Sequence, residues 1–298
     1  MTSNDVNSSS PHIAIYYHQL RPRILRLVAM YEQHFHRLGC EVSIIASTPS
    51  RCVDIQQLTA LRGDIDELIV MGGDGSVNIA AQVFAHSDVP ISVVPLGTGN
   101  DFARDNGIFD ASWRLQNSYE KRHVAMGRCG EHFFVNHAGA GLTVDLIRLQ
   151  RPWMKRLLRG GSYVLAILRY LCGPYEQRSS IHDTETGALY DAQIVAVSCF
   201  IGGGIPIYPS ANRSEGLLQC AAVPRATRWC QFKALVQVLR GRIEQTELVD
   251  LSVGSQFMIG DSEHSIELDG DSFDTGPQQI QVIPKGLTIY VPIQQSKD

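Results

Sequence analysis

Apolar runs of two different spacings divide the chain into two parts. Up to about residue 125, short apolar runs that are typical of buried strands alternate with segments of helical periodicity. The expected strands span residues 13–17, 42–46, 68–71 and 91–94, and a helix is expected from about residue 23 to residue 38. This alternation predicts an α/β layer built on a mainly parallel sheet.

Beyond residue 125, short β-prone runs dominate. They cover residues 132–135, 193–199, 217–223, 257–259, 265–268, 279–283 and 287–291. We therefore expect a polar, flexible tail over residues 1–10, an α/β domain over 11–125 and a β-rich domain over 126–298. The last residues are candidates to return to the first domain.

Two glycine-rich segments follow two of the expected strands. The first, GGDGSVN, spans residues 72–78, and the second, GTGND, spans residues 97–101. Glycines let backbone amides approach an anion closely, and a helix N-terminus adds free N–H groups. Either cluster alone could be a tight turn, but two clusters at neighbouring strand ends can face one ligand, as in open α/β sheets.

Asp74 makes passive anion binding a poor explanation of the first segment. A carboxylate repels phosphate unless it meets Mg²⁺ or accepts a proton. The residue types therefore indicate phosphoryl transfer.

Composition is that of an ordinary globular protein. The chain has 298 residues, a formal charge of -4, a pI near 6.2 and 44% hydrophobic residues. It has no basic field or zinc-finger spacing, so nucleic acid is not expected as a partner. Seven cysteines without a C-x-x-C pair suggest reduced thiols in the cytoplasm, and we find neither a signal peptide nor an apolar run long enough to span a membrane.

Five motifs in order resemble those of the diacylglycerol kinase catalytic-domain family, which includes bacterial lipid kinases and the sphingosine and ceramide kinases. They are GGDGSVN, PLGTGNDFARDNGI, NHAGAG (residues 136–141), GGG through PSA (residues 202–211) and LDGD (residues 268–271). The GGDGS string alone also occurs in phosphofructokinases. The resemblance implies an NAD-kinase-like α/β nucleotide-binding domain followed by a β-sandwich domain.

The resemblance also implies an ATP- and Mg²⁺-dependent kinase that phosphorylates a lipid hydroxyl, diacylglycerol-like or sphingoid-like. The residues expected to bind the nucleotide and its metal are Thr48, Gly72, Gly73, Asp74, Gly75, Ser76, Asn78, Gly97, Thr98, Gly99, Asn100 and Asp101. Two alternatives stay open. One is a catalytically silent nucleotide- or lipid-binding protein, and the other is a kinase for a soluble acceptor, as in NAD kinases.

Two carboxylates compete for the role of proton acceptor. Asp271 matches the glutamate that many bacterial members use, and its side chain is one methylene shorter. Asp74 matches the aspartate that has this role in sphingosine-kinase-like relatives. We expect both to be needed and to be brought together between the two domains.

The chain departs from the family pattern in three places. Ser76 replaces a threonine. The first strand ends in residues 18–22 (HQLRP) without a glycine, so either Arg21 or Arg23 supplies charge there or nucleotide binding is weaker. The family's structural Mg²⁺ loop carries an aspartate, whereas here Asn212, Glu215 and Leu217 are the candidate ligands.

Membrane contact is expected from residues 148–171. This segment contains six basic residues and no acidic residue, with interspersed Trp and Leu, so it can lie on anionic lipid. A helix packed on the second domain with solvated arginines is an equal alternative. We expect a cytoplasmic protein that works at the inner membrane surface, and a homodimer is possible.

His137, inside the NHAGAG motif, is expected to have a hydrogen-bonding or space-filling role.

Overall fold

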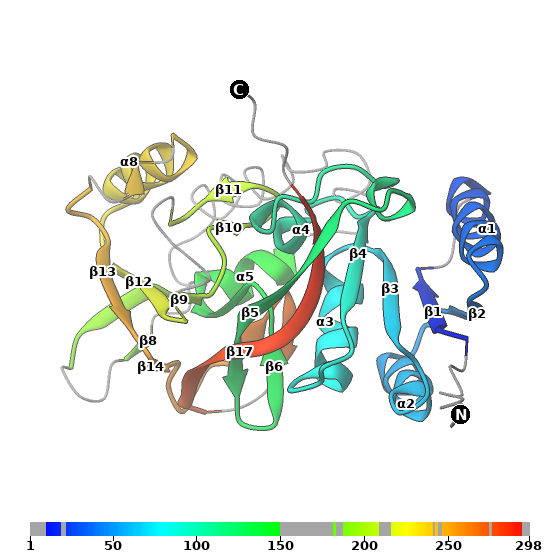
Figure 1. Ribbon diagram of the computed structural model, residues 1–298. Helices are drawn as coiled ribbons and strands as arrows, with labels where there is room; N and C mark the ends of the chain where they lie inside the picture. Colours follow the sequence, from blue (N-terminus) through cyan, green and yellow to red (C-terminus); the bar gives the residue numbers. More distant parts are fainter. Residues whose placement is uncertain are drawn as a thin grey trace, which may run out of the picture.

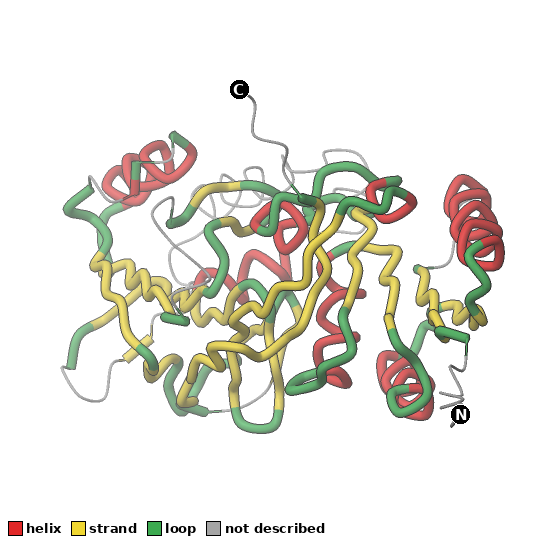
Figure 2. Tube along the Cα trace, in the orientation of Figure 1, coloured by secondary structure: helices red, strands yellow, loops and turns green. Residues whose placement is uncertain are grey.

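The computed structural model describes residues 10–18, 22–149, 181–182, 187–208, 216–240, 242–243, 246–273 and 276–293. Most of the expected tail and most of the segment 148–171 lie outside these residues, so the membrane contact expected there is not described. Figures 1 and 2 show α1 and α2 at one end of the molecule, beside β1 and β2, and α8 at the opposite end, beside β13.

Four parallel strands form the first half of an eight-stranded sheet. They run in the order β2 (Glu41–Ala46), β1 (His12–Tyr17), β3 (Glu67–Gly72) and β4 (Ile91–Pro95). All three pairs are parallel. The predicted parallel sheet is confirmed. Its central strands are buried on both faces, which is why they appear in the sequence as near-continuous apolar runs.

Helices cover both faces of this half-sheet. Helix α1 (Pro22–Arg37) packs against Ile69 and Met71, whereas α2 (Arg51–Leu61) and α3 (Asp74–Phe84) pack on the face of Leu68 and Val70. Successive residues of a strand point to opposite faces, so β3 contributes to both cores. Every residue of β3 is buried.

A long strand joins the two halves of the molecule. β17 (Gln278–Pro292) pairs with β4 in parallel near its end, where Ile289 faces Ile91, and with β5 (Tyr119–Cys129) in antiparallel along its length. The runs at 279–283 and 287–291, expected as two strands, are one strand with a register shift between Ile283 and Leu287. The sheet is completed by β6 (His132–Phe134) and β14 (Gln256–Ile259).

These pairings extend one sheet across both parts of the chain. β6 and β14 lie in the part expected as the second domain, and β17 lies in the last residues that were candidates to return to the first; all three belong to the same sheet as β1 to β4. The reason is that β17 and β5 are long enough to serve both halves. The boundary expected at residue 125 falls inside β5, and it stays a prediction.

A second, antiparallel sheet faces the end of the first. Its order is β13 (Asp250–Gly254), β12 (Leu218–Pro224), β9 (Leu189–Ala196), β7 (His137–Gly141), β15 (Ile266–Leu268) and β16 (Asp271–Phe273), and β8 (Ile181–His182) pairs with β9. The run predicted at 193–199 begins earlier, at Leu189, and ends at Ala196. Phe134 and Ile280 from the first sheet share a core with Val195 and Leu268 from the second. The predicted fold class, α/β followed by a β-sandwich, is confirmed.

A buried ion pair joins the segment before β5 to the first residue of β3. Arg114, in a short 3₁₀ helix (Trp113–Leu115), donates from Nε and Nη2 to the two carboxylate oxygens of Glu67, at 2.8 and 2.7 Å. The guanidinium also lies 3.9 Å from the ring centre of Tyr119 on β5. A bidentate pair of this kind fixes the 3₁₀ helix against the first residue of β3, at the end of the strand opposite the glycine loop.

Candidate functional site

The two glycine loops pack directly against each other. A Cβ on Gly97 would lie 2.5 Å from the Cα of Gly73, and one on Gly73 would lie 3.0 Å from the Cα of Gly97. The Leu96 N–H donates to the carbonyl of Gly72 at 2.9 Å. Only glycine permits this backbone contact, which explains why both motifs need it. Gly75, by contrast, has open space around its Cβ position.

Asn100 shapes the second loop. Its backbone is left-handed, with φ at 54°, and its side-chain oxygen accepts from the Gly97 N–H at 2.9 Å while its amide donates back to the Gly97 carbonyl at 3.1 Å. The side chain therefore closes the loop. Thr98, at the tip, is exposed.

Asp74 occupies the first turn of α3, where the helix dipole favours a negative charge. Its Oδ1 accepts from the Phe102 N–H at 2.9 Å and from the Asn136 amide at 3.2 Å. Asp74 thus joins three segments: the first loop, the second loop and the segment that leads into β7. The sequence did not indicate Asn136 as its partner.

Asp101, the first residue of the short helix α4 (Asp101–Asp105), lies beside Asp74. A Cβ on Gly99 would lie 3.1 Å from Oδ2 of Asp74 and 3.6 Å from Oδ2 of Asp101, so the two carboxylates flank one glycine. Burial raises the pKa of Asp101, and the nearby Asp74 raises it further, while N–H groups of Gly203 and Gly204 and the charge of His137 act in the opposite direction. Like charges placed this close need a compensating cation or a shared proton.

Two buried oxygens at this place lack a partner within the described protein. They are Oδ1 of Asp101 and Oδ1 of Asn136. Hard cations such as Mg²⁺ prefer carboxylate and amide oxygens, so these atoms, together with Asp74, fit such an ion. Within the described residues, no three His, Cys, Asp or Glu side chains gather into a metal cluster, so the protein alone offers few ligands.

Asp269 anchors the turn between β15 and β16. Its carboxylate accepts from the N–H groups of Val135, Asn136 and His137, at 2.7, 2.8 and 3.0 Å. It also accepts from the side chain of Asn78 on α3 at 2.6 Å. Burial raises the pKa of Asp269, and His137 and these donors oppose the rise. The LDGD motif contained the signal for this residue, but only Asp271 received a role from it.

His137 forms an ion pair with Glu267, with 3.1 Å between Nε2 and Oε1. Burial lowers the pKa of His137, but the carboxylates of Glu267, Asp269 and Asp101 outweigh burial and raise it to about 9. A charged imidazole therefore sits among the acidic groups and balances their charge. Nδ1 of His137 is buried without a hydrogen-bond partner among the described residues, and the hydrogen-bonding or space-filling role expected from the sequence stays a prediction.

Asp271 is held differently. Its side chain is 58% exposed, and Oδ2 lies 3.1 Å from Nη1 of Arg51 at the start of α2. The same guanidinium donates to Asn78 Oδ1. Arg51 therefore connects α3, which carries Asp74, with the turn that carries Asp271. Sequence patterns gave no signal for Arg51, because its partners come from distant segments.

Thr48 faces its own loop. Its N–H and its hydroxyl both donate to Asp54 Oδ1 at 2.8 Å, and Tyr16 donates to the other oxygen at 2.7 Å.

Leu217, the one candidate ligand of the structural metal in the described part, is exposed just before β12. Asn212 and Glu215 lie outside the described residues, as does Arg21, whereas Arg23 is exposed on α1.

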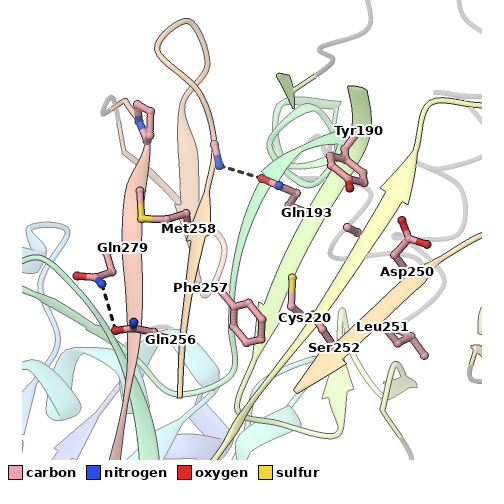
Figure 3. Close-up of a pocket in the computed structure, with 13 residues that line it drawn as sticks. Tyr190, Gln193, Cys220, Asp250, Leu251, Ser252, Gln256, Phe257, Met258 and Gln279 are labelled. Atoms are coloured by element: carbon pink, nitrogen blue, oxygen red, sulfur yellow. Dashed lines mark hydrogen bonds between the residues drawn. The ribbon is translucent and has the colours of Figure 1, made fainter. Parts of the chain in front are cut away.

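A separate pocket of about 460 Å³ lies in the sandwich. Figure 3 shows its lining, which comes from β9, β12 and β13 of one sheet and from β14 and β17 of the other; Gln193, Cys220, Ser252, Phe257 and Gln279 belong to it. None of the predicted site residues lines this pocket. Burial raises the pKa of the Cys220 thiol to about 11, so this cysteine is not a reactive thiolate at neutral pH.

Two family models match successive parts of the chain. The diacylglycerol kinase catalytic domain matches residues 21–129, and the YegS C-terminal NAD kinase β-sandwich-like domain matches residues 146–291. The chain belongs to the diacylglycerol kinase catalytic-domain family. This confirms the resemblance inferred from the five motifs, and it makes the chain a kinase that phosphorylates an alcohol group.

Curated relatives and solved structures agree with this assignment. A protein named "Probable lipid kinase YegS-like" from Chromohalobacter salexigens is 28% identical over 78% of this chain and 78% of its own length. The diacylglycerol kinase of Bacillus subtilis is 23% identical over 91% of this chain and 92% of its own length. A structure from Bacillus anthracis str. Sterne has a TM-score of 0.73 at 17% identity, over 97% of this chain and 98% of the other. The crystal structure of a diacylglycerol kinase from the same organism has a TM-score of 0.66 at 16% identity, over 94% and 96%.

None of the described helices is long and apolar enough to cross a bilayer.

Proposed function

We propose that this protein is an ATP-dependent lipid kinase that transfers the γ-phosphate of ATP to a lipid hydroxyl of diacylglycerol or sphingoid type. The observation that carries the proposal is the contact of Gly73 with Gly97, with Asp74 and Asp101 on either side of Gly99. The names of the relatives, lipid kinase and diacylglycerol kinase, support the lipid acceptor.

The phosphates would lie over the backbone of the two loops. The N–H groups in the first turn of α3 supply donors there, the space beside Gly75 is open, and Thr98 is exposed at the tip of the second loop. Asn78 and Thr48 would support the site through other residues and would not contact the phosphates themselves. Asn78 positions Arg51 and the β15–β16 turn, and Thr48 is tied to Asp54.

Asp74, Asp101 and the side-chain oxygen of Asn136 are the groups that would hold Mg²⁺. The ion would neutralise charge on the transferring phosphoryl group. Asp74 keeps Oδ1 fixed by two donors, which leaves Oδ2 directed toward Gly99. A structural ion at Asn212, Glu215 and Leu217 remains a separate proposal.

Asp271 is our candidate for the proton acceptor. It is exposed, and its one described ion pair is with Arg51, so it can meet the hydroxyl of an incoming acceptor. Asp74 is crowded by the glycine loops and suits a fixed electrostatic role. The acceptor lies in a bilayer, so the enzyme would work in the cytoplasm at the inner membrane surface, in peripheral contact with anionic lipid.

The test is transfer of labelled γ-phosphate, with Mg²⁺, into a total lipid extract separated by chromatography. We expect wild type to label a lipid, and Asp74→Asn to lose at least about a thousandfold in rate, the scale of removing a central electrostatic group from a phosphoryl-transfer site. Asp88→Asn is the matched control, because Asp88 is exposed in the turn before β4. It should behave as wild type.

Each other outcome identifies an alternative. ATP binding without transfer to any lipid would indicate a silent binding protein. Transfer to water-soluble alcohols alone would indicate a soluble acceptor. Full activity of Asp74→Asn would refute the assigned site.

A further inference from the structure

Helix α8 (Arg228–Leu239) presents an exposed aromatic pair at one end of the molecule. Trp229 is 64% exposed and Phe232 is 38% exposed, and their rings are stacked with 5.9 Å between centres. Lys233 places its ammonium 5.6 Å from the centre of the Trp229 ring. A large tryptophan held in water costs free energy, so such a pair commonly marks a contact surface.

These side chains lie along one face of the helix. Trp229, Phe232, Val236 and Arg240 are spaced by three or four residues, which places them on a single stripe. With Lys233, Gln237, Thr246 and Leu248 they border a hollow of about 340 Å³. We call this surface the α8 face.

The opposite side of α8 attaches the helix to the protein. Ala234 is buried there, and Gln231 donates to Asp191, whose side chain is buried beneath the helix. The aromatic pair is therefore directed outward by the packing of the rest of the helix.

The charge around the α8 face is positive. Between residues 216 and 243 the sequence has five basic side chains and no acidic one; they are Arg225, Arg228, Lys233, Arg240 and Arg242. The nearest described acidic residues along the chain are Glu247 and Asp250, which follow the helix. Stacked aromatics next to Lys and Arg match the interface of an anionic bilayer, where tryptophan sits at headgroup level and basic residues bind lipid phosphates.

The position of α8 connects this face with the site. The helix contacts β11 (Ile205–Pro206), which pairs with β10 (Phe200–Ile201), and β10 contacts α4. Figure 1 shows β10 and β11 between α8 and α4. The turn of this hairpin donates the Gly203 N–H to Asp101 at 2.9 Å. A bilayer that meets the α8 face would thus lie close to the hairpin that borders the phosphoryl-transfer residues.

We propose that the α8 face docks the protein on anionic membrane, with Trp229 and Phe232 entering the headgroup region and Lys233 and Arg240 facing lipid phosphates. The α8 face is made of other residues than the segment 148–171. The inference deepens the proposed function and rests on it for its purpose, but docking itself can be measured without any turnover.

The first experiment is sedimentation of the full chain with vesicles of equal parts phosphatidylglycerol and phosphatidylcholine. We expect wild type to pellet, and the double variant Trp229→Ser/Phe232→Ser to bind at least about tenfold more weakly. Lys233→Gln should weaken binding about fivefold, the scale of one basic contact with anionic lipid. Leu25→Ser is the matched control, because Leu25 is 55% exposed on α1, at the end of the molecule opposite α8. It should pellet as wild type.

Fluorescence supplies a second readout at the residue itself. The chain has three tryptophans, and the blue shift on adding vesicles should be lost in Trp229→Phe. Circular dichroism of each variant excludes unfolding as the cause. Equal pelleting of wild type and the double variant, or pelleting that does not need anionic lipid, would overturn the proposal.

Further outcomes distinguish membrane docking from a dimer contact and from the proposed kinase function. If wild type is a dimer and the double variant a monomer, the α8 face is a contact between copies of the chain and the membrane proposal fails. If the double variant loses transfer on vesicles but keeps it with a short-chain acceptor in detergent micelles, docking and catalysis are both supported. Binding to anionic vesicles by a wild-type protein that transfers phosphate to no lipid would leave docking standing and would refute the proposed function.

Discussion

The glycine loops and the β15–β16 turn each bring an aspartate to the site, but they hold it in different ways. Asp74 is fixed by backbone contact between two loops of the first sheet and by donors from Phe102 and Asn136. Asp271 is 58% exposed and paired with Arg51, while Asp269, two residues earlier, is half-buried and accepts from the N–H groups of Val135, Asn136 and His137. In the glycine loops the proposed functional residue, Asp74, is itself held by hydrogen bonds. In the β15–β16 turn only Asp269 is held in this way, and Asp271 is exposed.

This difference suits Asp74 to a fixed electrostatic role and Asp271 to the role of a proton acceptor that the substrate can reach. A group that stabilises charge on phosphate gains from being immobile, since no reorganisation is needed during reaction. A group that meets a bulky acceptor gains from exposure. The comparison predicts different effects for substitutions in the two regions.

The largest effect on stability is expected inside the turn. Asp269→Asn removes the charge that accepts four hydrogen bonds and faces His137, so we expect the free energy of unfolding to fall by about 3–5 kcal/mol. Asp271→Asn, two residues away, should change it by less than about 0.5 kcal/mol, as is usual for surface positions. Urea unfolding of both variants measures the contrast. Equal losses would mean that the turn is not anchored at its base.

The second effect depends on pH. Burial lowers the pKa of His137, but the surrounding carboxylates outweigh burial and raise it from 6.5 to about 9, so its stabilising charge is fully present below pH 6.5 and is lost as pH rises through about 9. The stability gap between wild type and His137→Gln should therefore be on the order of 3 kcal/mol near pH 6 and should shrink above pH 9. His36→Gln, at an exposed position on α1, is the control. A gap that grows with pH would contradict the charged imidazole.

A third effect tests the contact of the loops. Gly97→Ala would place a methyl group 2.5 Å from the Cα of Gly73, and we expect a loss of about 1–3 kcal/mol in the free energy of unfolding. Gly75→Ala has open space and lies in α3, so it should keep or slightly raise stability. Thermal unfolding distinguishes the two, and equal melting temperatures would show that the loops can separate freely.

The smallest effect concerns the acceptor side. Asp271→Asn should lower kcat about tenfold or more with little change in stability, and Asp271→Glu should restore most of the rate. Steady-state kinetics with the identified acceptor gives the answer. If Asp271→Asn turns over as fast as wild type, Asp74 takes the proton.

Local patterns predicted the loops and much of the fold. The parallel strands, the two glycine motifs and Asp74 could be recognised because each depends on residues close in sequence. The partners could not, since Asn136, Arg51 and Asp269 reach the site from distant segments through β7, α2 and the β15–β16 turn. The sequence did not indicate that β6, β14 and β17 share one sheet with β1 to β4, because it does not show that one long strand pairs with both halves of the molecule.

The most direct test of the central claim is to measure both Mg-ATP affinity and phosphoryl transfer for Asp74→Asn. If the loops bind phosphates and Asp74 supplies the fixed charge, calorimetry should give a dissociation constant within a few-fold of wild type or tighter, while transfer falls at least about a thousandfold. Transfer at the wild-type rate would contradict the account, and so would loss of transfer that merely follows loss of folding.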